Sequence, residues 1–168
     1  MDYFELFQLP VSLKVDKKQV EKKYYQLCRE FHPDHIPQED SAKIELALSE
    51  TARIHAARTV LEDANKRLEY LLKEKGHILP DEKYSLPPAF LAEMMDLNEQ
   101  LMELEFEPNE DVSKEVKQAL TALEQHLSEE VKPYFEMDTF VATDNEWEML
   151  KAYYYKRKYL QRVAEKLV

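Results

Sequence analysis

A histidine, a proline and an aspartate stand in a row at His32-Pro33-Asp34, directly after a basic amphipathic segment from Lys17 to Phe31. An imidazole and a carboxylate two residues apart are compatible with a general acid–base pair, a metal site completed by His35, or a recognition loop. Pro33 disfavours the α conformation at His32 and removes a backbone donor. The preceding helix should therefore end here and leave both polar side chains exposed.

The surrounding sequence favours the third of these interpretations. No cysteine or glutamate lies nearby at ligand spacing, and a loop that holds Pro33 and Pro37 is a poor chelate. An acid–base pair would need a pocket with a nucleophile or an oxyanion site, and there is neither a glycine-rich turn nor a serine elbow to supply one. We therefore predict a recognition loop, with no catalytic activity, no metal and no other cofactor.

The segment before the loop reads as a helix. Asp16 and Gln19 resemble a capping box, and apolar residues then recur at helical spacing: Val20, Tyr24, Leu27 and Phe31. Its other face carries Lys18, Lys22, Tyr25 and Arg29, and the segment holds five basic residues against two glutamates. This face could be a merely solvated surface or a binding surface, and the segment alone leaves both open.

Composition limits the class of protein. A chain of 168 residues with one glycine and 34% charged residues favours helices over sheets and tight hairpins, so we expect an all-α fold. The formal net charge of −11 disfavours nucleic acid and anionic membranes as partners. A lone Cys28, an acidic start and the lack of a long apolar stretch predict a cytoplasmic protein.

The rest of the first half also reads as helical. A short apolar turn, from Tyr3 to Phe7, should pack as a lid on the helices that come after it in the chain. After the loop, Asp40 or Ser41 can cap a long helix antiparallel to the first, with apolar positions at Ile44, Leu48, Ala52, Ala56 and Val60. Asp63 can cap a further helix containing Leu68, Leu71 and Leu72, which Gly76 should end in an αL conformation.

The second half predicts a helical bundle after a proline-containing connection. Phe90, Met94, Leu97, Leu101 and Leu104 repeat like the seam of a helical hairpin, and Val112 to Val131 supply the next helix, which Pro133 should stop or kink. Thr143 and Glu146 can form a capping box at the start of the last helix, with apolar residues at Met149, Tyr153, Leu160, Val163 and Leu167. We expect residues 1–76 and 89–168 to form two domains joined by residues 77–88.

A second apolar stripe follows Leu91, Met95 and Met102, about 120° around the helix from the first. It is bordered by Asp96, Glu99 and Glu103, and no basic residue occurs from Ala89 to Glu107. The stripe could pack on the third helix of the bundle or form a docking face for a basic partner. Both interpretations stay open on the sequence.

The opening Met1-Asp2-Tyr3-Phe4 with Leu9-Pro10, followed by Tyr24, Leu27 and Phe31-His32-Pro33-Asp34, resembles the J-domain of DnaJ-type co-chaperones. Together with Leu68-Glu69-Tyr70-Leu71-Leu72 and a helical tail, the whole chain resembles the HscB family of iron–sulfur cluster co-chaperones. The resemblance implies a J-domain built on an antiparallel helical hairpin with short flanking helices, followed by a C-terminal three-helix bundle.

The resemblance also implies partners and sites. His32, Pro33 and Asp34, with the basic helix before them, would engage a DnaK-type chaperone, HscA, and stimulate its ATPase; Lys18, Lys22, Tyr25 and Arg29 are assigned from their shared face. The tail would bind the scaffold protein IscU through Leu91, Ala92, Met95, Asp96, Glu99 and Glu103, with Tyr159 on the last helix. Ala92 and Tyr159 depart from the larger apolar residue and the phenylalanine of the family pattern.

Two further hypotheses come from other classes. A general J-domain protein could use its tail to dimerise or to grip unfolded chains, and an enzyme could use His32 and Asp34. We favour a monomeric adaptor without chemistry of its own, because the chain carries two separate charged faces and no cofactor motif.

Overall fold

The computed structural model describes residues 1–37 and 39–167, and the ordered elements within them are all helical. They are α1 (Tyr3–Leu6), α2 (Lys17–Glu30), a 3-10 turn η1 (Pro33–His35), α3 (Ser41–Leu61), α4 (Ala64–Glu74), α5 (Pro88–Phe106), α6 (Glu110–Phe135) and α7 (Asp144–Glu165). The all-α prediction is confirmed. Among the described residues, no helix is both long and apolar enough to cross a membrane.

The chain forms two compact units. The first contains Met1–Leu71 together with Tyr134–Val141, and the second contains Leu72–Pro133 with Ala142–Val168. The sequence did not indicate that the segment between α6 and α7 packs with the first unit. The predicted domain boundaries at residues 76 and 89 stay a prediction.

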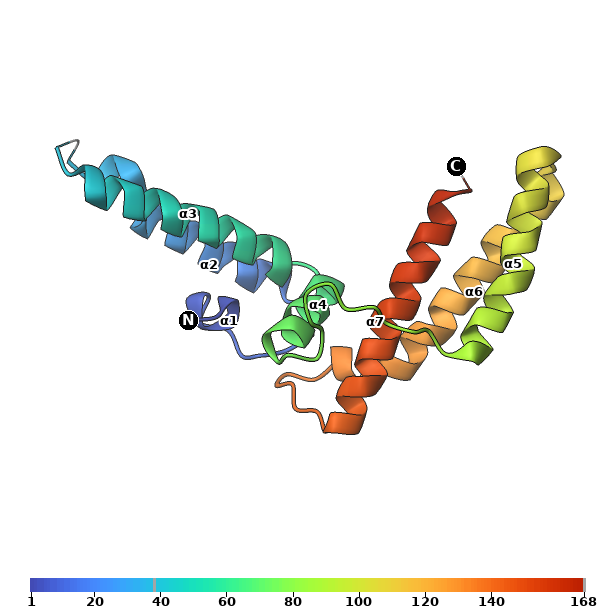
Figure 1. Cartoon of the computed structure of the whole chain (residues 1–168). Coiled ribbons are helices and arrows are strands. Elements are labelled where there is room, and N and C mark those ends of the chain that lie inside the picture. Colours follow the sequence, from blue (N-terminus) through green and yellow to red (C-terminus); the bar gives the residue numbers. More distant parts are fainter. Residues whose placement is uncertain (38, 168) are drawn as a thin grey trace. The chain divides into compact units, whose positions relative to one another are not determined.

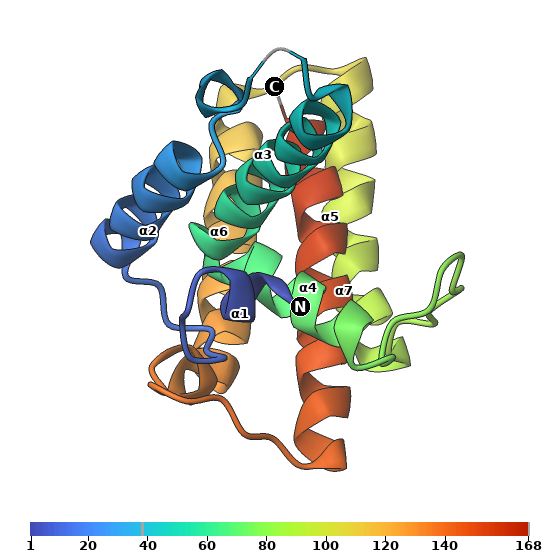
Figure 2. The same ribbon diagram turned by 90° about the vertical axis from the view of Figure 1, so that its left-hand side faces the viewer.

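The first unit is organised by α2 and α3, which lie side by side (Figures 1 and 2). Val20 and Tyr24 of α2 are buried, and the Tyr24 hydroxyl lies 2.9 Å from Nδ1 of His55 in α3. The short helix α1 packs against α3 and buries Phe4 and Leu6, as expected of a lid. Its Tyr3 ring stacks on Tyr70 of α4 with centroids 4.6 Å apart.

The buried face of α3 differs from the row of apolar residues read from the sequence. Of that row, Leu48, Ala52 and Ala56 are exposed, whereas the buried residues are Ala47, Ile54, Ala57 and Leu61. The reason is helical geometry. A series with a strict spacing of four drifts about 40° per step at 100° per residue, so five members cannot share one face. The buried set mixes spacings of seven, three and four and stays within about 80°.

The segment between α6 and α7 is tied to the loop before α2. Phe140 is buried and its amide donates to the Val11 carbonyl at 2.8 Å. The Ser12 hydroxyl donates to the Met137 carbonyl at 2.6 Å, and Lys14 Nζ lies 2.7 Å from Asp138 Oδ1. These bonds explain why residues far apart in sequence belong to one unit.

Arg67 of α4 joins three parts of the same unit from a buried position, with 3% of its surface exposed. Its guanidinium donates to the carbonyl oxygens of Leu61, Ser12 and Lys14 at 2.8, 2.9 and 2.8 Å. Burial lowers the pKa of Arg67 to about 10. The side chain thus satisfies backbone acceptors at the turn between α3 and α4 and in the loop before α2.

In the second unit, α5, α6 and α7 lie side by side and share an apolar core (Figure 1). The predicted seam of α5 is buried at Phe90, Met94, Leu97 and Leu101, and Leu104 is half-buried. On α7 the core also takes Trp147 and Leu150, which were not assigned from the sequence. The helix α6 passes Pro133 and ends at Phe135, so the proline does not stop it.

The predicted connection, residues 77–88, packs along α7 within the second unit. His77 stacks on Trp147 with ring centroids 4.8 Å apart, and Tyr84 stacks on Tyr155 at 4.3 Å. Lys151 Nζ donates to Glu82 Oε1 at 2.5 Å, and this bond lowers the pKa of Glu82. Proline content alone had suggested only a semi-rigid connection.

Helix ends follow the sequence closely. Asp16 accepts from the Gln19 amide at 3.1 Å, Asp40 accepts from the Lys43 amide, and Thr143 forms a full capping box with Glu146. Gly76 has a φ of +75° and follows α4, as predicted for an αL terminator.

Candidate functional site

The His32-Pro33-Asp34 loop stands where α2 ends. His32 is extended, with φ −67° and ψ 127°, and Pro33 begins the 3-10 turn η1. This is the conformation that a following proline imposes. The Asp34 amide donates to Nδ1 of His32 at 3.2 Å, and Asp34 Oδ2 lies 3.6 Å from the same nitrogen. The loop therefore holds imidazole and carboxylate together in one turn.

Both polar side chains of the loop are accessible. The exposed fraction is 52% for the His32 side chain and 87% for that of Asp34. Because Nδ1 accepts the backbone proton, a neutral His32 carries its own proton on Nε2. The loop therefore presents one ring donor and one carboxylate to solvent, and this exposure was predicted from Pro33.

A metal site at the loop would need His32, Asp34 and His35 to converge. His32, Asp34 and His35 do not belong to any group of three or more ligands in residues 1–37 and 39–167 that is arranged to hold a metal ion. The His35 ring lies edge-on to that of His32, with centroids 5.8 Å apart.

The four residues predicted on the outer face of α2, Lys18, Lys22, Tyr25 and Arg29, are all exposed. None of the three basic side chains forms an ion pair within the described part of the chain. The Tyr25 ring is 54% exposed and meets Tyr24 edge-on at 5.3 Å. The face therefore combines available positive charge with an anchored aromatic ring.

On α5, the second apolar stripe is exposed, and its role as a docking face stays a prediction. Leu91, Met95 and Met102 are 41%, 63% and 60% exposed, so they do not pack into the bundle. Ala92 and the acids Asp96, Glu99 and Glu103 are exposed as well. We name this the α5 face: Leu91, Ala92, Met95, Asp96, Glu99, Met102 and Glu103.

Tyr159 of α7 adjoins the α5 face and is half-buried. Its hydroxyl accepts from Nδ2 of Asn98 at 2.8 Å, and its ring meets Phe90 edge-on at 5.8 Å. Asn98 lies on the same side of α5 as Met95 and Met102, since the three are three to seven residues apart. Tyr159 therefore connects α7 to α5 beside the stripe through both a ring contact and a hydrogen bond. A phenylalanine at this position could make the ring contact but not the hydrogen bond.

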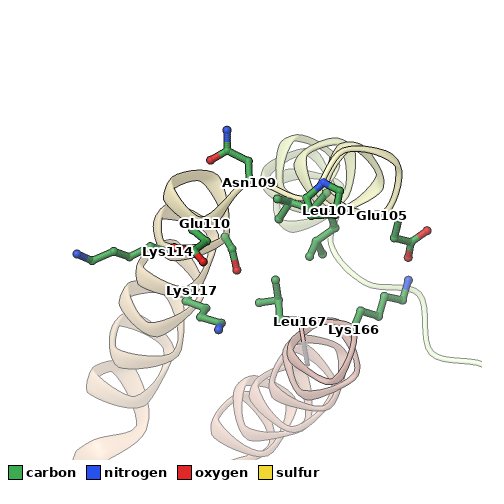
Figure 3. A pocket seen from close by; sticks show the side chains of 11 residues that line it. Leu101, Glu105, Asn109, Glu110, Lys114, Lys117, Lys166 and Leu167 are labelled. Carbon is green, nitrogen blue, oxygen red and sulfur yellow. The ribbon is translucent and has the colours of Figure 1, made fainter.

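The turn between α5 and α6 separates two hollows, one lined by charges of both signs and one by acidic charges alone among the described residues. The first, of about 750 Å³, opens between α5, α6 and α7; its lining includes the apolar Leu101 and Leu167 and the charged Lys114, Lys117, Lys166, Glu105 and Glu110 (Figure 3). The other, of about 630 Å³, is lined by Glu99, Met102, Glu103, Leu104, Phe106, Glu107, Asn109 and Val112. The second hollow shares three residues with the α5 face.

Comparison with known proteins covers both halves of the chain. Residues 2–70 match the DnaJ domain, and residues 86–168 match the HSCB C-terminal oligomerisation domain. The co-chaperone protein HscB homolog of Vibrio atlanticus is 34% identical over 140 residues, which cover 77% of this chain and 82% of the relative. The homolog of Vibrio parahaemolyticus is 32% identical over 139 residues, covering 77% and 81%.

Solved structures agree with the sequence comparisons. The chaperone HscB from Vibrio cholerae superposes with a TM-score of 0.72 at 25% identity, over 99% of this chain and 95% of that chain. The human co-chaperone protein HscB superposes with a TM-score of 0.77 at 27% identity, over 99% of this chain and 80% of that chain.

Proposed function

The chain belongs to the HscB family of J-domain co-chaperones, and we propose that it brings an IscU-type iron–sulfur scaffold protein to an HscA-type chaperone while stimulating the chaperone ATPase. The observation that carries this proposal is the α5 face, an exposed apolar stripe bordered by acids. We further propose that the protein has no catalytic activity, acts as a monomer, and works in the cytoplasm, where the free Cys28 of α2 fits a reducing environment.

The J-domain side of the proposal follows from the loop and the basic face. Lys18, Lys22 and Arg29 would attract an acidic surface of the chaperone, and Tyr25 would supply apolar contact. Once docked, the charged carboxylate of Asp34 can accept a hydrogen bond from the chaperone. The His32 ring can donate one.

Stimulation of an ATPase requires preferential binding to its active conformation. Each tenfold increase in the turnover rate corresponds to about 1.4 kcal/mol of tighter binding to that conformation. Hydrogen bonds to charged groups contribute about 1.5–3 kcal/mol each, so the two loop side chains suffice for a stimulation of ten- to a hundredfold. The rest of the interface need only hold the loop in place.

The α5 face fits a scaffold with a basic and apolar surface. Exposed methionines adapt to varied partner shapes, and the flanking carboxylates complement positive charge. A second copy of this chain is a poorer occupant, because two α5 faces would bring acids against acids. The same argument disfavours tail-mediated dimerisation through this face.

A reconstituted ATPase assay with the HscA-type chaperone and the IscU-type scaffold tests the proposal. His32→Gln and Asp34→Asn should abolish stimulation and leave scaffold binding unchanged. His35→Gln is the matched control, because this residue is also exposed and lies in the same turn. If the control loses as much stimulation as the other two variants, the assignment of the loop side chains is wrong.

Scaffold binding is measured with Leu91→Ala combined with Met95→Ala, which should weaken binding at least tenfold, or about 1.4 kcal/mol. The control is Leu46→Ala combined with Leu48→Ala, since these α3 side chains are 63% and 55% exposed but lie in the other unit. Equal affinity of the first variant and the wild type would remove the α5 face from the proposal. Sedimentation of the protein alone checks that it is a monomer.

A further inference from the structure

The exposed apolar stripe of α5 does not end at Met102. Phe106, the last residue of the helix, is 84% exposed and comes fifteen residues after Leu91. At 100° per residue, Leu91, Met95, Met102 and Phe106 lie within about 60° of one another and extend over about 22 Å. An exposed phenylalanine in line with two exposed methionines makes this stripe longer than the sequence pattern indicated.

The row of acids continues in the same direction. Glu107 follows Glu99 and Glu103 at the same spacing, is exposed, and closes α5 through its amide, which donates to the Glu103 carbonyl at 2.8 Å. Its carboxylate has no ion-pair partner among the described residues. Both the apolar and the acidic component of the α5 face thus reach the tip of the α5–α6 hairpin.

The acidic hollow of about 630 Å³ lies at this tip. Its apolar lining consists of Leu104 and Val112, which are half-buried, and of the exposed Met102 and Phe106. The polar lining consists of three glutamates and Asn109, whose side-chain oxygen already accepts from the amides of Asp111 and Val112 at 3.0 and 3.2 Å. The acceptors that remain available in the hollow are therefore carboxylates.

We propose that this hollow extends the scaffold-binding surface and receives a lysine or arginine side chain of the scaffold, while Phe106 packs on apolar surface beside it. The inference rests on the function proposed above and names a part of the same surface. A long basic side chain fits because its aliphatic stem can lie along Met102 and Val112 while its charged end reaches the carboxylates. An acidic or purely apolar group would leave three carboxylates desolvated without a partner.

The charge of the neighbouring hollow differs from that of the acidic one. It is lined by charges of both signs, Lys114, Lys117 and Lys166 with Glu105 and Glu110, and Lys114 points away from its leucines (Figure 3). A basic side chain is therefore attracted more strongly on the side of Glu103 and Glu107, where no lysine of the described chain lines the hollow. The tip of the hairpin can therefore determine the orientation in which the scaffold binds along the stripe.

The test uses the full chain, the IscU-type scaffold and equilibrium titration at two salt concentrations. Phe106→Ala should weaken binding about tenfold, as expected for an aromatic anchor, and leave the melting temperature unchanged because the ring is exposed. Glu107→Gln should weaken binding about threefold and reduce its salt dependence. Glu105→Gln is the matched control, since this acid lies on the same turn but lines the lysine-rich hollow, and it should change nothing.

Charge reversal identifies the occupant. Glu107→Lys should weaken binding more than Glu107→Gln, and the loss should be partly restored by changing one scaffold lysine or arginine to glutamate. If no such scaffold change restores binding, or if Phe106→Ala binds like the wild type, the inference is overturned. The double change Leu91→Ala with Met95→Ala is run alongside: when it weakens binding and Phe106→Ala does not, the proposed function stands without this extension. When the wild type itself does not bind the scaffold, both are refuted.

Discussion

Replacement of Arg67 by methionine tests how the first unit is held together. The change keeps most of the aliphatic stem and removes the guanidinium that donates to the carbonyls of Leu61, Ser12 and Lys14. Among the described residues Arg67 is the one charged side chain that is buried. The substitution therefore removes three buried hydrogen bonds, which stabilise the fold, and one buried charge, whose desolvation destabilises it.

The two effects oppose each other. Three hydrogen bonds from a charged group stabilise by about 5–9 kcal/mol in total. Against this, desolvation lowers the pKa of Arg67 from 12.5 to about 10, which corresponds to a cost of about 3 kcal/mol at neutral pH. The hydrogen bonds outweigh the desolvation cost, and Arg67→Met should lower the free energy of unfolding by about 2–6 kcal/mol. For a unit of this size the melting temperature should fall by about 10 °C or more.

Urea unfolding followed by circular dichroism measures this loss. Arg58→Met is the matched control, because Arg58 donates to Glu62 at 2.6 Å with both side chains about one third exposed. A partly exposed pair of this kind contributes little to stability, and the remaining contact that Arg58 loses is its position over the Tyr24 ring, 4.3 Å from the centroid. If Arg67→Met costs no more than Arg58→Met, or stabilises the protein, then the three carbonyl bonds do not outweigh the buried charge and the reasoning is refuted.

Three further predictions concern the second unit and the end of α4. Leu91→Ala with Met95→Ala should leave the melting temperature within about 2 °C of the wild type, because both side chains are exposed; a loss of 2–5 kcal/mol would mean that they are core residues. Gly76→Ala should cost about 1 kcal/mol in urea unfolding and Gly76→Asn less, because φ is +75° and an added Cβ meets no atom within 4 Å, so the cost is backbone strain alone. The hydrogen bond from Lys151 lowers the pKa of Glu82 below 4.5, so its contribution to stability is present above that value and is lost as the pH falls through the lower pKa of the folded state. The difference in melting temperature between the wild type and Glu82→Gln should accordingly be larger at pH 7 than at pH 3, and an equal difference at both would contradict this.

The sequence by itself determined the helices, their ends and the loop. Asp16, Asp40 and Thr143 cap helices through bonds to amides three residues away, and Gly76 adopts the positive φ that few other residues tolerate. Pro33 likewise disfavours the α conformation at His32, which is extended in the structure. These features depend on neighbours in the chain, so the local pattern is sufficient to predict them.

Only the tertiary structure decided which apolar residues are buried. Leu91 and Leu48 are exposed although they lie in regular apolar patterns, and Trp147 and Phe140 are buried although no pattern marked them. Burial depends on the groups that pack across from a residue, and a periodicity states only which residues share a face. Arg67 shows the same limit, because the carbonyls that it binds come from positions six, fifty-five and fifty-three residues away. A basic residue in a helix gives no local sign that distant backbone acceptors will converge on it.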